Sequence, residues 1–237
     1  PIIMLLVRVN LFAVAAFVFC VWLMAQETLM HSVGLGAWHL ALPAEPWSSR
    51  IWFFNPFGWQ LIFFTGFAFM RGWLPKPPVS MVLVLLAAVI VLITIPLSDV
   101  GVREFDLPWA KAWRADYAAW FDKTSFAPLR YLHFLALAYL AWVVAGDKGN
   151  RLLSRGTGAA ARVWGWVVAI VLKVGQQSLA VFVVSMFLAR LMGFGIDVTK
   201  FDTLSTVLIN IAGCMGLVAT AYGAGWFKSQ PWKKAIA

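Results

Sequence analysis

Arg130 and His133 form the residue pair with the clearest chemical potential, three positions apart near the start of an apolar run. On a helix this spacing puts both side chains on one face. A guanidinium one turn from an imidazole can hold a carboxylate or a phosphate while the imidazole moves a proton. The alternatives are an arginine that reaches the lipid headgroups and a histidine held by packing. We interpret His133 as a candidate catalytic residue and Arg130 as a candidate substrate-binding residue.

A second polar group lies in the run Asn55-Pro56-Phe57-Gly58-Trp59-Gln60. Pro56 disturbs the helix that this apolar segment would form, and Gln60 is expected just deeper in the membrane. A buried amide can bond to a neighbouring helix as readily as to a substrate. Asn55, Trp59 and Gln60 are therefore predicted to contact substrate, with bonding between helices as the open alternative.

A third group is found where another apolar run begins, in Lys173-Val174-Gly175-Gln176-Gln177-Ser178. Ser178 is predicted to be the N-cap of the following helix. The start of a helix together with Lys173 could attract an anionic donor molecule. Lys173, Gln176, Gln177 and Ser178 are thus candidate substrate-binding residues, and helix capping alone is the alternative.

Other chemistries lack their sequence signatures. Cys20 and Cys214 lie within apolar runs, which favours neither a disulfide framework nor a thiolate metal site. His31 and His39 fall in a polar stretch rather than on facing helices, as a bis-histidine haem would need. No zinc spacing, P-loop or dinucleotide motif occurs. We therefore predict no metal and no bound cofactor.

The elements that position these residues follow from composition. Of 237 residues, 62% are hydrophobic and only 12% are charged, which excludes a typical soluble domain and a disordered chain. The formal charge of +9, combined with 14 Trp and long apolar runs, fits membrane loops better than a nucleic-acid surface. The predicted fold is all-α, a polytopic transmembrane helix bundle.

Six complete crossings and a partial N-terminal helix over Ile2 to Val7 are expected from run length. Glycines, Gly193 and Gly195 among them, are expected to end runs. Residues 1–237 are taken as a single integral membrane domain, the C-terminal part of a larger protein. The six predicted crossings are Leu11 to Ala25, Ile51 to Met70, Val79 to Leu97, Leu129 to Ala145, Leu179 to Met192 and Leu204 to Phe227.

Two of the segments that connect the predicted crossings are expected to form helical or membrane-associated structure. Aromatic residues recur every three or four positions from Phe105 to Trp120, which predicts an amphipathic helix on the outer face. It would either anchor the protein at the interface or stack against a sugar-like acceptor. The segment Arg162 to Val174 carries about a dozen apolar residues, too few to span, so it is predicted to be interfacial or re-entrant.

The charge distribution predicts the orientation. If Lys228, Lys233 and Lys234 at the C-terminus are cytoplasmic, alternation places eleven of the 19 Lys and Arg residues inside, with Asp147 as the only acid there. Basic residues concentrate in cytoplasmic loops. We therefore predict a multi-pass protein of the bacterial inner membrane with a cytoplasmic C-terminus.

Three blocks in this order resemble the OpgC family: Phe54 to Gln60, Leu129 to Tyr139 and Gly175 to Phe182. These membrane proteins are similar to the broader acyltransferase-3 group and succinylate osmoregulated periplasmic glucans. The resemblance implies around ten crossings with both ends cytoplasmic, succinyl-CoA as the acyl-CoA donor, and a periplasmic glucan as the acceptor. It also implies a catalytic histidine in a preceding crossing, so this fragment alone is expected to be inactive. Gln176 stands where the family often has a basic residue.

The leading hypothesis is therefore a membrane O-acyltransferase that moves an acyl group to a glucan hydroxyl. The main alternative is a membrane transporter of a glucan, a lipid or a small solute, in which the same polar residues would line a path. A carboxylate inside the bilayer, which proton-coupled transport usually requires, is not expected from the sequence. A noncatalytic membrane scaffold is the third hypothesis. The sequence leaves the oligomeric state open.

Overall fold

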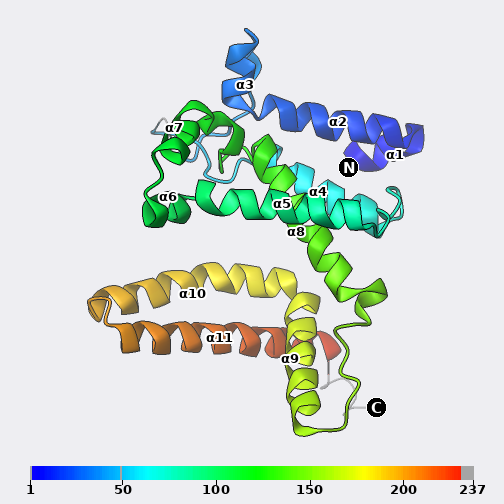
Figure 1. Ribbon diagram of the computed structural model, residues 1–237, viewed down its shortest axis with the longest axis vertical. Coiled ribbons are helices and arrows are strands. Elements are labelled where there is room, and N and C mark those ends of the chain that lie inside the picture. Colours follow the sequence, from blue (N-terminus) through cyan, green and yellow to red (C-terminus); the bar gives the residue numbers. More distant parts are fainter. Residues whose placement is uncertain (1, 49, 231–237) are drawn as a thin grey trace. The chain divides into compact units, whose positions relative to one another are not determined.

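The computed structural model describes residues 2–48 and 50–230, and the regular elements of this part of the chain are helices (Figure 1). The chain forms two compact units, Pro1–Val144 and Ala145–Ala237. That residues 1–237 make one integral membrane domain stays a prediction. Lys233 and Lys234, which entered the predicted orientation, lie outside the described residues.

Local signals explain where the helices of the first unit begin. The side chain of Asn10 accepts a hydrogen bond from the backbone N–H of Ala13 at 2.6 Å, and Ser80 caps another helix in the same way. Pro56 and Pro108 each occupy a first helical turn, where proline is tolerated. The helices are α1 (Ile2–Val9), α2 (Leu11–Met24), α3 (Glu27–Ser32), η1 (Gly36–Trp38), α4 (Pro56–Met70), α5 (Met81–Leu97), α6 (Asp99–Phe105), α7 (Pro108–Asp116), η2 (Ala118–Phe121) and α8 (Pro128–Ala145).

The core of the first unit lies between α2 and α4. Val14, Val18 and Trp22 of α2 are buried against Leu61 of α4, and Tyr131 of α8 packs beside them. The indole N–H of Trp22 donates to the carbonyl of Phe126 at 3.0 Å, so the polar atom of this large side chain is satisfied. This contact ties the end of α2 to the loop before α8.

The second unit contains η3 (Asp147–Gly149), α9 (Ala159–Gln176), α10 (Ser178–Val198) and α11 (Thr203–Ser229). In Figure 1, α10 and α11 lie side by side and antiparallel, and α9 runs across them near one end. A Cβ at Gly216 would lie 3.0 Å from Leu188 and one at Gly195 would lie 3.4 Å from Ile209. Glycine therefore lets these two helices approach closely, as small residues do in membrane bundles.

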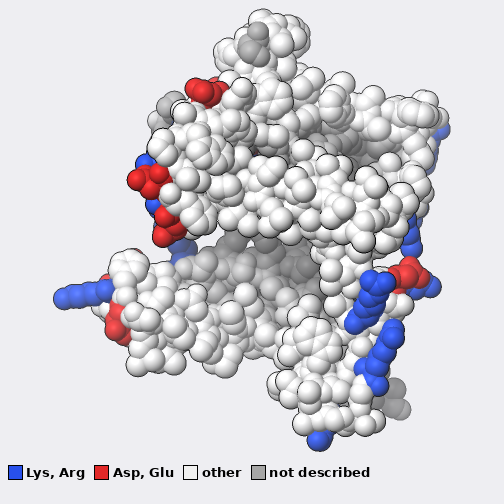
Figure 2. All heavy atoms as spheres, viewed as in Figure 1, with Lys and Arg blue, Asp and Glu red and all other residues white. Residues whose placement is uncertain are grey.

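Exposed surface in both units is largely apolar. Phe12, Met70 and Leu179 are 87%, 88% and 77% exposed. Figure 2 shows Lys, Arg, Asp and Glu gathered near the ends of helices, with uncharged helix faces between them. Apolar helix faces of this kind are stable against lipid chains, because no water contacts them there. The protein is therefore a membrane protein.

The number of crossings differs from the six predicted. Four helices of the described chain, α8 to α11, are long and apolar enough to span a membrane, and a fifth span results if α5 and α6 are counted as one segment bent by 60°. Two of the predicted crossings form shorter helices, α2 with 14 residues and α4 with 15. α4 begins only at Pro56 because Asn55 caps it, so 51–55 is not helical. The six complete crossings are not confirmed.

Two helix boundaries in the second unit also differ from prediction. α10 continues through Gly193 and Gly195 to Val198, because packing against α11 outweighs the low helix propensity of glycine. α9 extends well beyond the segment Arg162 to Val174 and reaches spanning length. α9 runs across α10 and α11 (Figure 1), and its interfacial or re-entrant placement stays a prediction.

The prediction of a single amphipathic helix from Phe105 to Trp120 is wrong, because the helix is interrupted. Asp106 adopts a left-handed conformation with φ of 45°, which ends α6, and Pro108 then starts α7. α7 ends at Asp116 and is followed by the short helix η2. The aromatic residues are thus distributed over α6, α7, η2 and the residues that join them.

Candidate functional site

The larger cavity of the first unit has a volume of about 890 Å³ and collects residues from three stretches of the chain, 53–59, 91–100 and 113–137. One side is aromatic, and the other carries arginine, histidine and hydroxyl groups. Every lining segment belongs to the predicted outer ends of helices or to the loops between them. The lining residues are Phe53, Phe54, Trp59, Val91, Thr94, Ile95, Leu97, Ser98, Asp99, Val100, Trp113, Arg114, Phe121, Lys123, Phe126, Leu129, Arg130, His133, Phe134 and Leu137.

Arg130 lies in the first turn of α8 and is held by one hydrogen bond. Its Nε donates to the carbonyl of Phe121 at 2.6 Å, which fixes the plane of the guanidinium. Within residues 2–48 and 50–230, Arg130 forms no ion pair with a carboxylate. The other guanidinium N–H groups are therefore able to bind an anionic or oxyanionic group in the cavity.

His133 lies one turn further along α8, as its spacing predicts, and lines the same cavity. Its Nδ1 is 3.0 Å from Oγ1 of Thr94 on α5. The hydroxyl of Thr94 also donates to the carbonyl of Val91 at 2.7 Å. In the tautomer in which His133 donates to Thr94 from Nδ1, Nε2 is unprotonated and is able to act as a general base.

Arg114 is a second cation of the cavity that the sequence did not single out. It donates from Nη1 to the carbonyl of Leu97 at 2.6 Å and forms an ion pair with Asp99. Its guanidinium carbon lies 4.6 Å from the centre of the Phe121 ring. Because Asp99 compensates its charge, Arg114 mainly holds α7 and its aromatic residues against the end of α5. The only sequence signal for its place in the cavity was its position within the aromatic pattern of α7.

Trp59 forms part of the aromatic wall. Its indole N–H donates to the carbonyl of Lys123 at 3.1 Å. The centre of its ring lies 4.9 Å from the ring centre of Phe54 and 4.7 Å from that of Phe126. Trp113 stacks on Phe121 with ring centres 5.7 Å apart. Flat faces of this kind are suited to stacking on sugar rings or other planar groups.

Asn55 and Gln60, both predicted to contact substrate, bond to other chain segments, and Asn55 also lines the smaller pocket described below. Asn55 is only 4% exposed: its side chain caps α4 at Phe57 N, 2.9 Å away, and donates to the carbonyl of Leu40 at 2.6 Å. Gln60 donates to the carbonyl of Val18 on α2 at 2.7 Å and does not line the larger cavity. Their amides therefore act between chain segments, which is the alternative that the sequence left open.

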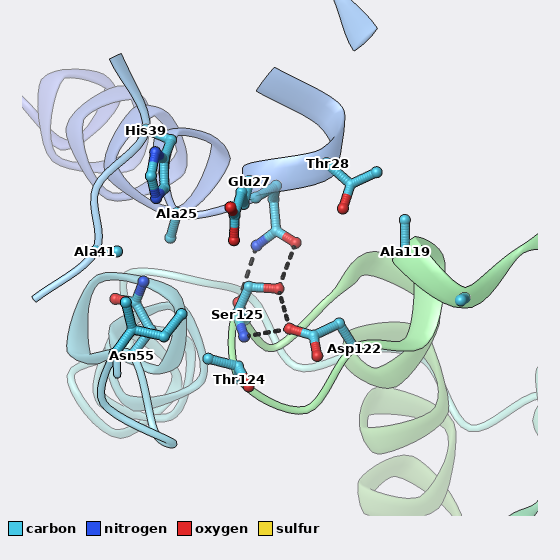
Figure 3. A pocket seen from close by; sticks show the side chains of 13 residues that line it. Ala25, Glu27, Thr28, His39, Ala41, Asn55, Ala119, Asp122, Thr124 and Ser125 are labelled. Carbon is cyan, nitrogen blue, oxygen red and sulfur yellow. Dashed lines mark hydrogen bonds between the residues drawn. The ribbon is translucent and has the colours of Figure 1, made fainter. Parts of the chain in front are cut away.

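A smaller pocket of about 290 Å³ lies beside this network and was not anticipated from the sequence (Figure 3). Gln26 donates to the carbonyl of Ser125 at 2.9 Å, and the hydroxyl of Ser125 lies 2.9 Å from a carboxylate oxygen of Asp122. Gln26 and Ser125 are both buried. Around them, Glu27, Thr28 and other short side chains line the space. These residues match no motif, and only the fold brings them together.

The predicted donor residues all lie at the junction of α9 and α10, in the second unit. Nζ of Lys173 is 5.7 Å from the ring centre of Tyr222, and Gly225 leaves room for its side chain. Gln177 occupies the N-cap position of α10 without a side-chain cap, and Ser178 is the first helical residue, so the predicted N-cap role of Ser178 is wrong. Gln176 and Ser178 are exposed. The backbone break falls one residue earlier because Gln177 also ends α9.

The comparisons with known proteins give one match. A protein-family model described as "OpgC protein" matches residues 1–229. No curated protein matches the chain, and no solved structure does.

Proposed function

Because this chain belongs to the OpgC family, we propose that it is an O-acyltransferase of the bacterial inner membrane that moves a succinyl group from succinyl-CoA to hydroxyls of periplasmic glucans. Membership links the protein to the modification of osmoregulated periplasmic glucans and is consistent with a transferase. The observation that supports the reaction is the larger cavity. It joins the guanidinium of Arg130, the imidazole of His133 and an aromatic wall.

In the proposed reaction, an acceptor hydroxyl attacks the thioester carbonyl. A carbon–oxygen bond forms, the carbon–sulfur bond breaks, and the proton of the hydroxyl ends on the sulfur of the departing coenzyme A. The base would be the histidine that the family resemblance places in a preceding crossing or Nε2 of His133, and it would accept that proton and return it to the sulfur. Arg130 would stabilise the negative charge that develops on the carbonyl oxygen, or hold the second carboxylate of the succinyl group. The aromatic wall with Trp59 would orient the sugar.

The donor is proposed to bind at the junction of α9 and α10. Lys173 supplies a positive charge there, and Gln176, Gln177 and Ser178 supply polar groups. In the predicted orientation this junction is cytoplasmic and the larger cavity is external, so the junction is proposed only as the place where the donor first binds, and the thioester must then reach the larger cavity. Replacing Lys173 with Gln should therefore raise the KM for succinyl-CoA and leave binding of the glucan unchanged. An unchanged donor KM would remove Lys173 from the donor site.

The test is mass spectrometry of periplasmic glucans from cells with the intact gene, without it, and with the gene restored. We expect a succinyl mass increment that is lost on deletion and returns on complementation. His133→Gln should abolish the increment while the protein remains as abundant as the wild type. Identical glucan modification in all strains would contradict the proposal, and a change in the location of the glucans alone would favour the transporter.

A further inference from the structure

We propose that the smaller pocket is a subsite for a second sugar unit of the acceptor; this inference rests on the proposed function and specifies how a polymeric substrate is held. The pocket lies between the start of α3, the chain around His39 and the loop that precedes α8 (Figure 3). Its volume of about 290 Å³ is at the lower end of the range for small-molecule pockets. It is therefore suited to a single small ring rather than to an extended ligand.

The lining supplies hydrogen-bond acceptors that the protein itself does not use. Oδ2 of Asp122 accepts from the backbone N–H of Ser125 at 2.8 Å and from its hydroxyl, whereas Oδ1 has no hydrogen-bond partner in the described chain. Glu27 and Thr28 are exposed at the pocket, and their side chains have no partner among residues 2–48 and 50–230. Carboxylates and hydroxyls accept readily from sugar hydroxyls.

The charge of the pocket disfavours an anionic ligand. Among the described lining residues there is no Lys or Arg, and both charged groups, Glu27 and Asp122, are acidic. His39 is the other titratable side chain of the lining, and its Nδ1 lies 3.3 Å from the carbonyl of Gly36. A succinyl or phosphate group would be repelled, whereas a neutral hydroxyl-rich ring would not. The acyl donor is thus not the ligand of this pocket.

One short segment separates the two cavities and contributes to both. Phe121, Lys123 and Phe126 line the larger cavity, and Asp122 and Ser125, which alternate with them, line the smaller pocket. Hydrogen bonds fix this wall from both sides: Arg130 donates to the carbonyl of Phe121, and Gln26 donates to the carbonyl of Ser125. A chain of linked sugars that passes the edge of this wall would place one unit on each side of it. Such two-site binding raises affinity above that for a single sugar.

The experiment measures binding of a linear gluco-oligosaccharide to the full-length protein in lipid nanodiscs without any acyl donor, with glucose as the comparison. The oligosaccharide should bind more tightly than glucose. Glu27→Gln keeps the shape of the side chain and should raise the Kd for the oligosaccharide by about tenfold, because a hydrogen bond to a charged acceptor is lost. Thr28→Val should raise it less.

Glu104→Gln is the matched control, since Glu104 is an exposed glutamate of the first unit that lines neither cavity. Its Kd should equal that of the wild type. Unchanged Kd values in both pocket variants would overturn the subsite. It would also be overturned if the oligosaccharide did not bind and the pocket instead bound calcium in a way that Glu27→Gln abolishes. Because the assay contains no donor, its result is independent of turnover. Glu27-dependent binding without acyl transfer would leave the subsite standing and remove the proposed reaction.

Discussion

The two units hold their polar side chains in different ways. In the first unit, Trp22, Gln60 and Asn55 donate to carbonyls that lie 104, 42 and 15 residues away along the chain. In the second unit, Ser185, Asn210 and Thr220 bond to carbonyls only three or four residues earlier in the same helix. These side chains of the first unit fix segments against one another, whereas those of α10 and α11 bond within their own helix.

This difference indicates where a preorganised site can form. A reacting group must be held within a fraction of an ångström, which requires neighbours whose own positions are fixed. Arg130 and His133 have such neighbours in Phe121 and Thr94. Lys173 lies beside the ring of Tyr222 and the backbone of Gly225, and no ion pair of Lys173 is found among residues 2–48 and 50–230. We therefore expect chemistry in the first unit and looser, largely electrostatic binding in the second.

Gly58→Ala should break the architecture of the first unit and is the largest effect that we predict. A Cβ at Gly58 would lie 2.1 Å from the carbonyl oxygen of Ser125, and that atom belongs to the wall between the cavities. Overpacking against backbone should cost about 3 kcal/mol. Gly66→Ala in the same helix meets nothing within 4 Å and should be tolerated. Protein abundance and melting temperature in detergent distinguish the two variants, and equal stability would contradict the packing described.

Arg130→Gln should reduce succinyl transfer by about 100-fold, as removal of one preorganised donor to an oxyanion does. Arg103→Gln is the control, because Arg103 bonds to a carbonyl of its own helix and lines neither cavity. The measurement is kcat/KM for purified protein with glucan and succinyl-CoA. If both variants lost activity equally, net charge rather than the position of Arg130 would be responsible.

Gln60→Met should lower the free energy of unfolding by about 1 kcal/mol, because it removes a net hydrogen bond between α2 and α4 while keeping the side-chain volume. Asn210→Leu removes a local bond on an exposed helix face and should change stability by less. Unfolding in denaturant measures both variants. A larger effect at Asn210 than at Gln60 would reverse the comparison between the units.

The smallest predicted effect concerns the start of α11. The pKa of Asp202 lies below its ordinary value because the backbone N–H of Ser205 donates to its carboxylate at 3.0 Å. A folded-state pKa that is lowered gives stability that is present above the unfolded pKa of about 3.9 and lost as the pH falls through the folded value. The melting temperature of the wild type should therefore fall slightly more on acidification below about pH 4 than that of Asp202→Asn, which retains a capping side chain. Parallel curves would exclude this contribution.

Sequence by itself determined the membrane class, the helical fold and the pairing of Arg130 with His133. Low charge and long apolar runs leave few alternatives to membrane helices, and a spacing of three is sufficient to put two side chains on one helix face. Local signals were less reliable where tertiary packing competes with them. Gly193 and Gly195 did not end α10, since α11 packs against it.

Only the tertiary structure decided which polar residues share a site. Thr94 bonds to His133 from 39 positions away, and Gln26 reaches Ser125 across 99 positions. No local pattern encodes such contacts, because they depend on how α2, α4, α5 and α8 pack together. The same packing turned Asn55 and Gln60 into links between chain segments and created a pocket around Asp122 that no motif announces.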